Sequence, residues 1–155
     1  MSNKSFTLLE AIVAIFVLST GILAISSLIS YFISASSISR QRLVAAYLVQ
    51  EGIEIVRNLR DNNLINLRNW DERLNNGDWQ ADYDDFSLSP YTGAFLNLES
   101  SGFYGYGPGV QTNFRRKINL QKSGDTLTIR VDVEWRERGR WHSLSATEKI
   151  YNWQP

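Results

Sequence analysis

The sequence predicts an α+β protein in which one long N-terminal helix packs on a C-terminal antiparallel β-meander. Three observations predict this fold. An uncharged run covers residues 11–39, an amphipathic pattern follows it without a break, and apolar and polar residues alternate strictly over 127–135. These patterns are typical of a membrane-spanning helix, a helix with one buried face, and a half-buried strand, respectively.

Composition excludes several classes of function. The 155 residues allow one modest domain beside the apolar segment, and 16 basic residues balance 16 acidic ones, so charge gives no reason to infer a nucleic-acid contact. The chain has no cysteine and a single histidine, His142. Disulfides, thiolate metal sites and Ser-His-Asp chemistry are therefore not expected. We expect no cofactor and no enzymatic activity.

The first half of the helix is predicted to span a membrane over residues 6–39. Its uncharged run exceeds the roughly 20 residues that a helix needs to cross a bilayer. A cleavable secretory signal would end its apolar core sooner, at a small-residue cleavage site. The segment before the span is short and carries Lys4, and a long polar domain follows the span. This arrangement favours an N terminus inside and a domain outside. The positive-inside rule adds almost nothing, because the span is flanked only by Lys4 on one side and by Arg40 and Arg42 on the other.

One carboxylate, Glu10, stands near the start of this apolar segment. An acid in a spanning helix is costly and is therefore a candidate functional residue. However, Thr7-Leu8-Leu9-Glu10 also fits a capping box, in which an acid in the first turn is stabilised by the helix dipole. The physics of these residues alone leaves both explanations open.

The stretch Phe6-Thr7-Leu8-Leu9-Glu10-Ala11 follows a short polar leader and begins a long apolar helix. It resembles the class III signal of type IV pilins and secretion-system pseudopilins. The resemblance implies that residues 1–5 are a leader peptide, that prepilin peptidase cleaves between Ser5 and Phe6, and that Phe6 becomes N-methylated. It also implies that Glu10 contacts the Phe6 amine of a neighbouring subunit. This chain departs from the family pattern at Ser5, where the family usually has glycine.

The resemblance further implies a pilin-like fold and a structural role as a minor pilin or pseudopilin in a type IV pilus or type II secretion-like filament. The implied partners are prepilin peptidase, other pilin or pseudopilin subunits, an inner-membrane assembly platform and membrane lipid. The implied location is the inner membrane, crossed once with the C-terminal domain outside, and then a periplasmic or cell-surface filament. The alternative is a monomeric signal-anchored extracytoplasmic binding protein that does not assemble, with the aromatic loops of residues 79–106 as its contact surface.

The extracytoplasmic domain is predicted to cover residues 40–155 and to begin with an amphipathic helix over 40–61. No proline precedes Pro90, so this helix can continue the membrane span. Apolar residues recur at spacings of three or four, which indicates one buried face. These are Val44, Leu48, Gly52, Ile55 and Leu59, with Leu43, Tyr47 and Val56 beside them. Gly52 interrupts good helix formers and would let a strand approach the helix.

Residues 62–112 are predicted to be irregular, because Asp61-Asn62-Asn63 supplies polar stop signals for the helix. We expect short helical turns within 67–74 and small strands around 95–98. Asp82, Asp84 and Asp85 belong to the densest acidic group in the chain. Carboxylates on a loop are candidate calcium ligands, but their order does not fit an EF-hand, and we favour solvated turn acids.

The C-terminal third is predicted to form the β-meander, over residues 113–151. Three runs are separated by turn sequences, and the middle run alternates Leu127, Ile129, Val131, Val133 and Trp135 with polar residues. Leu144, Ala146 and Ile150 are expected to supply the apolar face of the third strand. We expect the amphipathic helix to cover the apolar face of the sheet.

Overall fold

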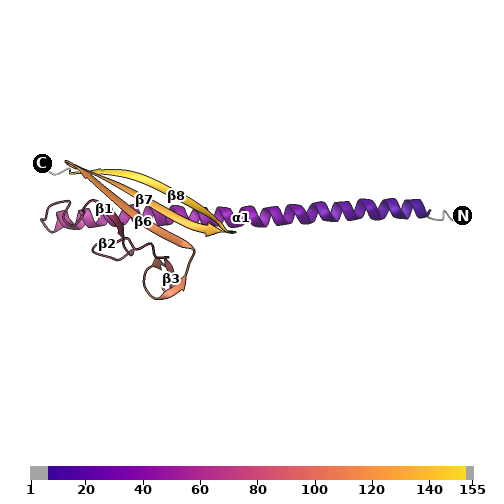
Figure 1. The fold of residues 1–155 in the computed structure, drawn as a ribbon, viewed down its shortest axis with the longest axis horizontal. Coiled ribbons are helices and arrows are strands. Elements are labelled where there is room, and N and C mark those ends of the chain that lie inside the picture. Colours follow the sequence, from indigo (N-terminus) through magenta and orange to yellow (C-terminus); the bar gives the residue numbers. More distant parts are fainter. Residues whose placement is uncertain (1–6, 153–155) are drawn as a thin grey trace. The chain divides into compact units, whose positions relative to one another are not determined.

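The computed structural model describes residues 7–152. One long helix, α1 (Leu8–Ile65), comes first, and Figure 1 shows strands following it along the chain. The strands in the described range are β1 (Gly77–Gln80), β2 (Ser89–Pro90), β3 (Asn97–Glu99), β4 (Tyr104–Gly105), β5 (Gly109–Gln111), β6 (Phe114–Ser123), β7 (Thr126–Glu137) and β8 (Arg140–Tyr151). The chain divides into two compact units between Arg40 and Gln41.

The first unit consists of the N-terminal part of α1. Every side chain from Ile12 to Ile33 is exposed. Within α1 a window of 18 residues has a mean hydropathy of 2.5, so the helix is long and apolar enough to cross a membrane by length and composition. The α1 helix thus has the character predicted for its first half.

Hydroxyl groups in this unit bond to the backbone of their own helix. Ser27 Oγ donates to Leu23 O at 3.0 Å, and Ser30 Oγ donates to Ser26 O at 3.0 Å. Ser19 and Thr20 likewise donate to carbonyls one turn earlier. An unsatisfied polar group is costly in hydrocarbon. These hydroxyl donors are satisfied within the helix, and the segment keeps an apolar surface despite its serines.

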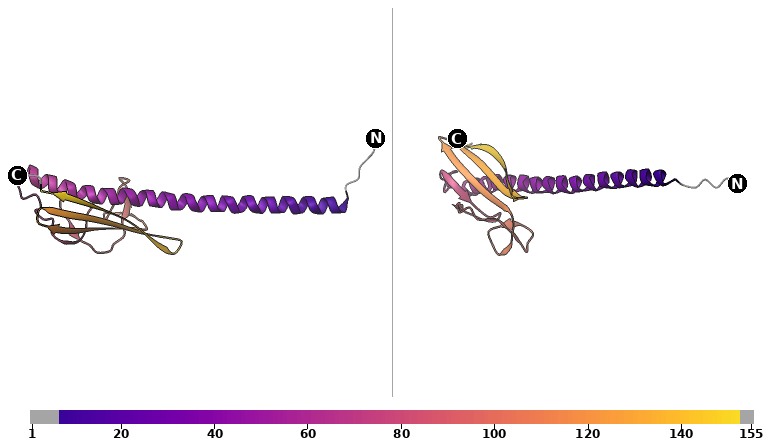
Figure 2. Two further views of the ribbon diagram at one scale, coloured as in Figure 1. Left: turned by 90° about the horizontal axis from the view of Figure 1, so that it is seen from above. Right: turned by 45° about the vertical axis from the view of Figure 1, so that its right-hand side comes forward.

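The second unit is built on a five-stranded sheet with the order β2-β1-β6-β7-β8, in which all neighbouring strands are antiparallel. Strands β6, β7 and β8 form the predicted meander, with registers from Phe114↔Trp135 to Ser123↔Thr126 and from Thr126↔Tyr151 to Glu137↔Arg140. A separate three-stranded sheet has the order β4-β3-β5. Figure 2 shows the long strands of the meander from two further directions.

The core of this unit lies between α1 and the sheet, which confirms the predicted α+β fold with its pilin-like layout. All five apolar residues of the alternating run in β7 are buried. From α1 the buried residues of this unit are Ala45, Leu48, Val49, Gly52, Ile55, Val56, Leu59 and Asn63. Their spacing of three, four and seven gives one stripe along the helix.

At Gly52 the helix α1 lies close against the sheet. A Cβ atom added there would lie 2.8 Å from Val131 Cγ1. Beside this contact Arg116 of β6 is fully buried; its Nη1 donates to Glu51 Oε1 at 2.7 Å and its Nη2 donates to Ala81 O at 2.7 Å. Breaking a buried ion pair is strongly destabilising. Gly52 and Arg116 therefore join helix, sheet and the loop at Ala81.

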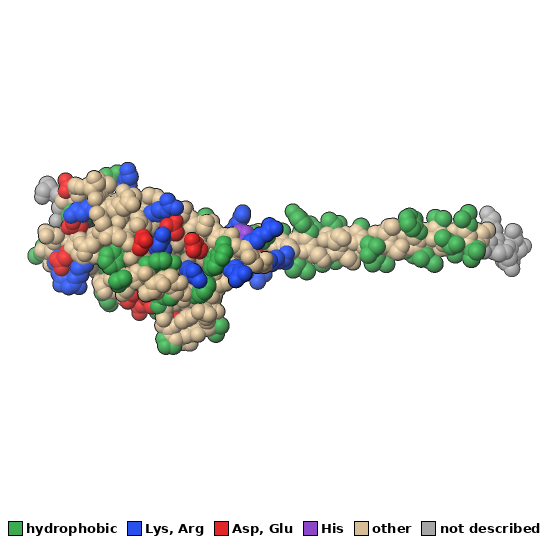
Figure 3. Space-filling model, in the orientation of Figure 1, with side chains coloured by type: hydrophobic (Ala, Val, Ile, Leu, Met, Phe, Trp, Pro, Cys, Tyr) green, Lys and Arg blue, Asp and Glu red, His purple; other side chains and the backbone are tan. Residues whose placement is uncertain are grey.

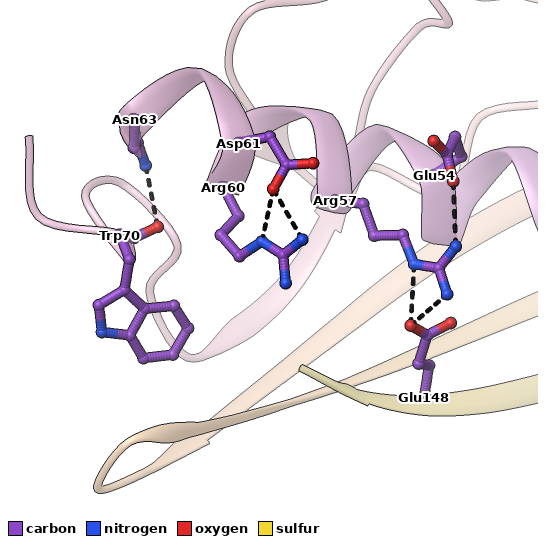
Figure 4. A network of polar contacts seen from close by, with 7 residues as sticks. All are labelled: Glu54, Arg57, Arg60, Asp61, Asn63, Trp70 and Glu148. Carbon is purple, nitrogen blue, oxygen red and sulfur yellow. Dashed lines mark hydrogen bonds and ion pairs between the residues drawn. The ribbon is translucent and has the colours of Figure 1, made fainter. Parts of the chain in front are cut away.

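The region 62–112 contains more regular structure than the sequence predicted. The α1 helix continues to Ile65, because Asn63 stays helical and uses its buried amide to hold the following loop. Its Nδ2 donates to Trp70 O at 3.3 Å (Figure 4) and to Glu72 O at 2.8 Å. Within 67–74 the chain forms single hydrogen-bonded turns, in which Glu72 N donates to Asn69 O and Leu74 N donates to Asp71 O, and these described residues do not form a helix. Positive φ angles at Leu67 and Arg73 interrupt a helical path.

Strand β8 differs from the prediction in its burial. Ile150 is buried and Ala146 is half-buried, whereas Leu144 is 38% exposed. The reason is that β8 is an edge strand of the sheet, while α1 makes its tight contact at Val131 of β7. On α1, Leu43 and Tyr47 are likewise exposed although the helical pattern placed them beside the buried stripe.

We predict that Gly52→Ala destabilises the second unit. Alanine gains about 1 kcal/mol in helix propensity, but overpacking against Val131 costs about 1–3 kcal/mol. The expected net loss is about 1 kcal/mol, seen as a lower unfolding temperature of the sheet by circular dichroism of the full chain in detergent. Gly21→Ala is the control, because nothing lies within 4 Å of a Cβ atom added at Gly21.

A double variant sharpens this test. Gly52→Ala should cost less in a Val131→Ala background, because the shortened side chain leaves room for the new methyl group. An equal loss in both backgrounds would show that Gly52 does not act through its contact with Val131.

Candidate assembly surface

The start of α1 is held by a threonine cap. Glu10 N donates to Thr7 Oγ1 at 3.3 Å, and Ala11 N donates to Thr7 O at 3.2 Å. In a full capping box, Thr7 N would also donate to the Glu10 carboxylate. This second hydrogen bond is not formed between these described residues. The threonine cap therefore accounts for where the helix begins, and it leaves the Glu10 carboxylate unused.

Glu10 is exposed in the first turn of α1, and its carboxylate makes no hydrogen bond or ion pair with the described residues. The cleavage site, Ser5 and Phe6, and the N-methylation site, Phe6, lie outside the described residues, so both assignments stay predictions. The contact between Glu10 and a neighbouring subunit also stays a prediction. Chemically, this carboxylate is available to a cation that another molecule provides.

Exposed apolar side chains continue from Glu10 along the first unit, and Figure 3 shows hydrophobic groups along this helix. Those exposed most widely are Leu8, Leu9, Ile12, Val13, Ile15, Phe16, Val17, Leu18, Ile22, Leu23, Ile25, Leu28, Ile29, Tyr31, Phe32 and Ile33. Apolar surface of this extent marks a membrane or protein contact. In such surroundings an unpaired carboxylate is costly, so pairing Glu10 with a cation is favoured.

A groove of about 410 Å³ lies in the second unit between α1 and the edge strand β8. Its apolar lining includes Ala46, Ile53, Leu144 and Ala146. At the groove Arg57 of α1 reaches across to β8, and its Nη2 lies 2.5 Å from Glu148 Oε1, while its Nη1 donates to Glu54 Oε2 (Figure 4). Sequence reasoning missed this groove, although Glu148 on the helix-facing side of β8 was a signal that this side is not fully covered.

The calcium candidates lie in a loop whose carboxylates hold backbone amides. Asp85 Oδ2 accepts from Asp82 N at 2.8 Å, and Asp82 Oδ1 accepts from Tyr106 N at 2.8 Å. Asp84 is exposed. Within the described residues, no group of three or more His, Cys, Asp or Glu is placed to hold a metal ion. Asp82 and Asp85 thus accept backbone hydrogen bonds that stabilise the loop, and the calcium assignment stays a prediction.

Three of the eight aromatic residues in the loops predicted to form an alternative contact surface pack on the core. Trp79, Tyr104 and Tyr106 are half-buried against it, and Tyr106 Oη donates to Arg116 O at 3.1 Å. Burial raises the pKa of Tyr106 to about 12. Tyr83, Phe86 and Phe103 are instead exposed, and Phe86 is the most exposed of the three at 83%. The loops therefore contribute both to the core and to the exposed surface.

We predict a specific pH effect at Asp82. Burial raises the pKa of the Asp82 carboxyl above its ordinary value of 3.8, with further raising by Asp85 and Glu99 and a lowering by the Tyr106 amide. Just above pH 3.8 the Asp82 carboxyl is more often protonated in the folded chain than in the unfolded chain. Its contribution to stability is therefore fully present below this pH and is lost as the pH rises through the pKa of the folded chain. Asp82→Asn should therefore gain stability relative to the wild type as the pH is raised.

Thermal unfolding at several values between about pH 4 and about pH 7 measures this difference. Asp84→Asn removes the same charge from an exposed position and serves as the control. A constant difference between Asp82→Asn and the wild type across this range would contradict the raised pKa.

No protein-family model, curated protein or solved structure matches the chain. The functional interpretation consequently rests on two features, the N-terminal sequence around Glu10 and the exposed apolar surface of α1.

Proposed function

We propose that the chain is a minor pilin or pseudopilin, a structural subunit of a type IV pilus or of a type II secretion-like filament. One observation carries the proposal: Glu10 lies without a partner among the described residues at the head of a helix whose apolar side chains are exposed from Ile12 to Ile33. The resemblance of residues 6–11 to a prepilin signal points to the same function. A filament supplies both a cover for the apolar surface and a cation for Glu10.

In this function prepilin peptidase cleaves between Ser5 and Phe6, and the new Phe6 amine is N-methylated. Before assembly, α1 holds the subunit in the inner membrane with the second unit outside. On assembly, the Phe6 amine of one subunit pairs with Glu10 of its neighbour. This ion pair forms away from water, where the attraction between opposite charges is stronger than in solution. An inner-membrane platform carries out the assembly.

The helix α1 also offers exposed apolar residues through which the second units of neighbouring subunits would contact one another. Leu43 and Tyr47 are 56% and 63% exposed and lie one turn apart on α1. They extend the exposed apolar residues into the second unit, and the groove between α1 and β8 adds a further apolar surface. Neighbouring subunits in a filament would cover these residues.

The rival function is a monomeric signal-anchored extracytoplasmic binding protein. The exposed Phe86 ring and the stacked Tyr83 and Phe103 rings, 4.4 Å apart, favour some contact surface on the loops. However, the packing of Trp79, Tyr104 and Tyr106 against the core reduces the aromatic surface available to a partner. The two functions differ in what they require of Glu10, because a simple anchor has no use for a carboxylate.

The proposal predicts that Glu10→Gln prevents filament incorporation without removing the protein from the membrane. Losing an ion pair in a low-dielectric contact costs about 2 kcal/mol or more, so the amount of subunit in sheared filaments should fall more than about tenfold. The measurement is an immunoblot of filament and membrane fractions from the native host. Glu54→Gln, on the same helix but exposed and paired with the half-buried Arg57, is the control.

The anchored-monomer function makes the opposite prediction. If Glu10→Gln leaves the filament fraction unchanged, or if Glu10→Leu improves membrane retention without any loss of function, the assembly role of Glu10 is refuted.

A further inference from the structure

Three arginines surround the turn between β7 and β8, in the sequence Arg136-Glu137-Arg138-Gly139-Arg140. All three side chains are exposed, whereas Glu137 is only 7% exposed. Positive φ angles at Arg138 and Gly139 make a tight turn of this hairpin. The charge that the turn presents to its surroundings is therefore positive.

This turn lies at the end of the second unit where α1 begins within it. Asn113 connects α1 with the end of β7, because its Nδ2 donates to Gln41 Oε1 at 3.0 Å and to Arg136 O at 2.8 Å. Arg42 is exposed on the helix beside Gln41. In the sequence, Arg42 follows the last residue of the uncharged run, Ser39, by three positions.

Ion pairs of the second unit lie elsewhere. Arg57, Arg60, Arg68 and Lys122 pair with acidic residues on the later part of α1, on β8 and in the loop after α1. By contrast, Arg42, Arg136 and Arg140 form no ion pair with any residue in the described range 7–152. In Figure 3 blue side chains gather beside the purple histidine, while red acidic groups lie further along the sheet.

An aromatic group accompanies these charges. Trp141 follows Arg140 in β8 and is 51% exposed. Arg115 of β6 lies over two rings, with its Cζ 4.1 Å from the Phe95 centroid and 5.1 Å from the Trp141 centroid. Glu134 lies opposite Arg115 in the register and two residues before Arg136 in β7, so the acidic part of this face begins one row beyond Arg136 and Trp141. Exposed tryptophan beside basic residues is typical of membrane–water interfaces.

We propose that Arg42, Arg136, Arg138, Arg140 and Trp141 form an arginine surface that binds the anionic headgroups of the bilayer in which α1 is anchored. The inference rests on the membrane anchoring in the proposed function and adds a second, lipid-specific contact to it. Guanidinium groups bind phosphate in a bidentate manner. Basic residues close to a membrane surface that carries anionic lipid are attracted to its headgroups.

Lipid fits this surface better than nucleic acid or a protein partner. The uncharged segment of the same chain ends three residues before Arg42, so a bilayer around that segment is present at a high effective concentration. Nucleic-acid binding at physiological salt depends on several phosphate contacts made from free solution. Docking on headgroups would hold the second unit at the membrane surface until the subunit is extracted for assembly.

The test uses the full chain reconstituted in lipid nanodiscs. The chain has no cysteine, so Ser143→Cys near the turn and Ser123→Cys at the opposite hairpin can each carry a single fluorophore. We expect a headgroup-bound quencher to quench the Ser143→Cys label strongly in discs that contain phosphatidylglycerol and weakly in pure phosphatidylcholine. The Ser123→Cys label should show little quenching in both, and high salt should abolish the difference.

Substitution of the arginines gives the quantitative test. Each arginine near an anionic surface contributes about a fivefold factor, so Arg42→Gln/Arg136→Gln/Arg140→Gln should weaken docking about 100-fold. The control Arg73→Gln/Arg130→Gln/Lys149→Gln removes the same charge from other parts of the second unit and should leave docking unchanged. If both triple variants lost docking equally, docking would depend only on the net charge of the chain, and the proposal would be overturned.

The remaining outcomes separate this inference from the proposed function. A chain that resists alkaline extraction from the discs but shows the same quenching in both lipids overturns the arginine surface and leaves the membrane anchor intact. A chain that alkali extracts contradicts the anchor itself. Arginine-dependent binding of a duplex DNA oligonucleotide, without any response to phosphatidylglycerol, would assign the surface to nucleic acid and overturn the lipid proposal.

Discussion

The structure depends on the close contact between α1 and the sheet at Gly52. A side chain at this position would meet Val131, so only a glycine lets the helix lie this close to β7. The same contact encloses Arg116, whose guanidinium is held by Glu51 and by the Ala81 carbonyl. Because the buried stripe of α1 runs from Ala45 to Asn63, the helix residues that the sheet covers all belong to the second unit.

This division gives one helix two different roles. In the second unit the buried apolar residues of α1, from Ala45 to Leu59, complete a core, whereas every side chain from Ile12 to Ile33 is exposed to whatever surrounds the molecule. Lipid alone would satisfy the apolar side chains and the self-bonded hydroxyls, but it would not satisfy Glu10. In the filament that we propose, a neighbouring helix would cover the apolar side chains and would also supply a cation for Glu10, which a lipid anchor alone does not provide. The threonine cap at Thr7 explains only where the helix begins.

The sequence predicted those parts of the fold in which a pattern extends over many residues. The alternation in β7 and the apolar stripe of α1 each repeat often enough to identify one buried face, and Gly52 stood out as a break in a helix. The strands β1 to β5 are too short to show a period, and they exist because of pairing with partners far along the chain. Asn63 looked like a stop signal because its tertiary bonds to Trp70 and Glu72 are not visible in the sequence. Leu144 looked like a core residue because the sequence does not specify which strand lies at the edge.

Glu10 could be identified from the sequence as a residue requiring explanation, whereas the lack of a partner for its carboxylate among the described residues required the structure.

The intact mass of the protein extracted from its native membrane tests the central claim most directly. Our account predicts the mass of a chain that begins at Phe6, without residues 1–5, and that carries one added methyl group. This mass would establish that Ser5 is accepted before the cleaved bond and that an amine is generated at Phe6 for the pair with Glu10. The mass of the full 155-residue chain would contradict the account, because an uncleaved protein would lack the N-terminal Phe6 amine that the proposed filament requires.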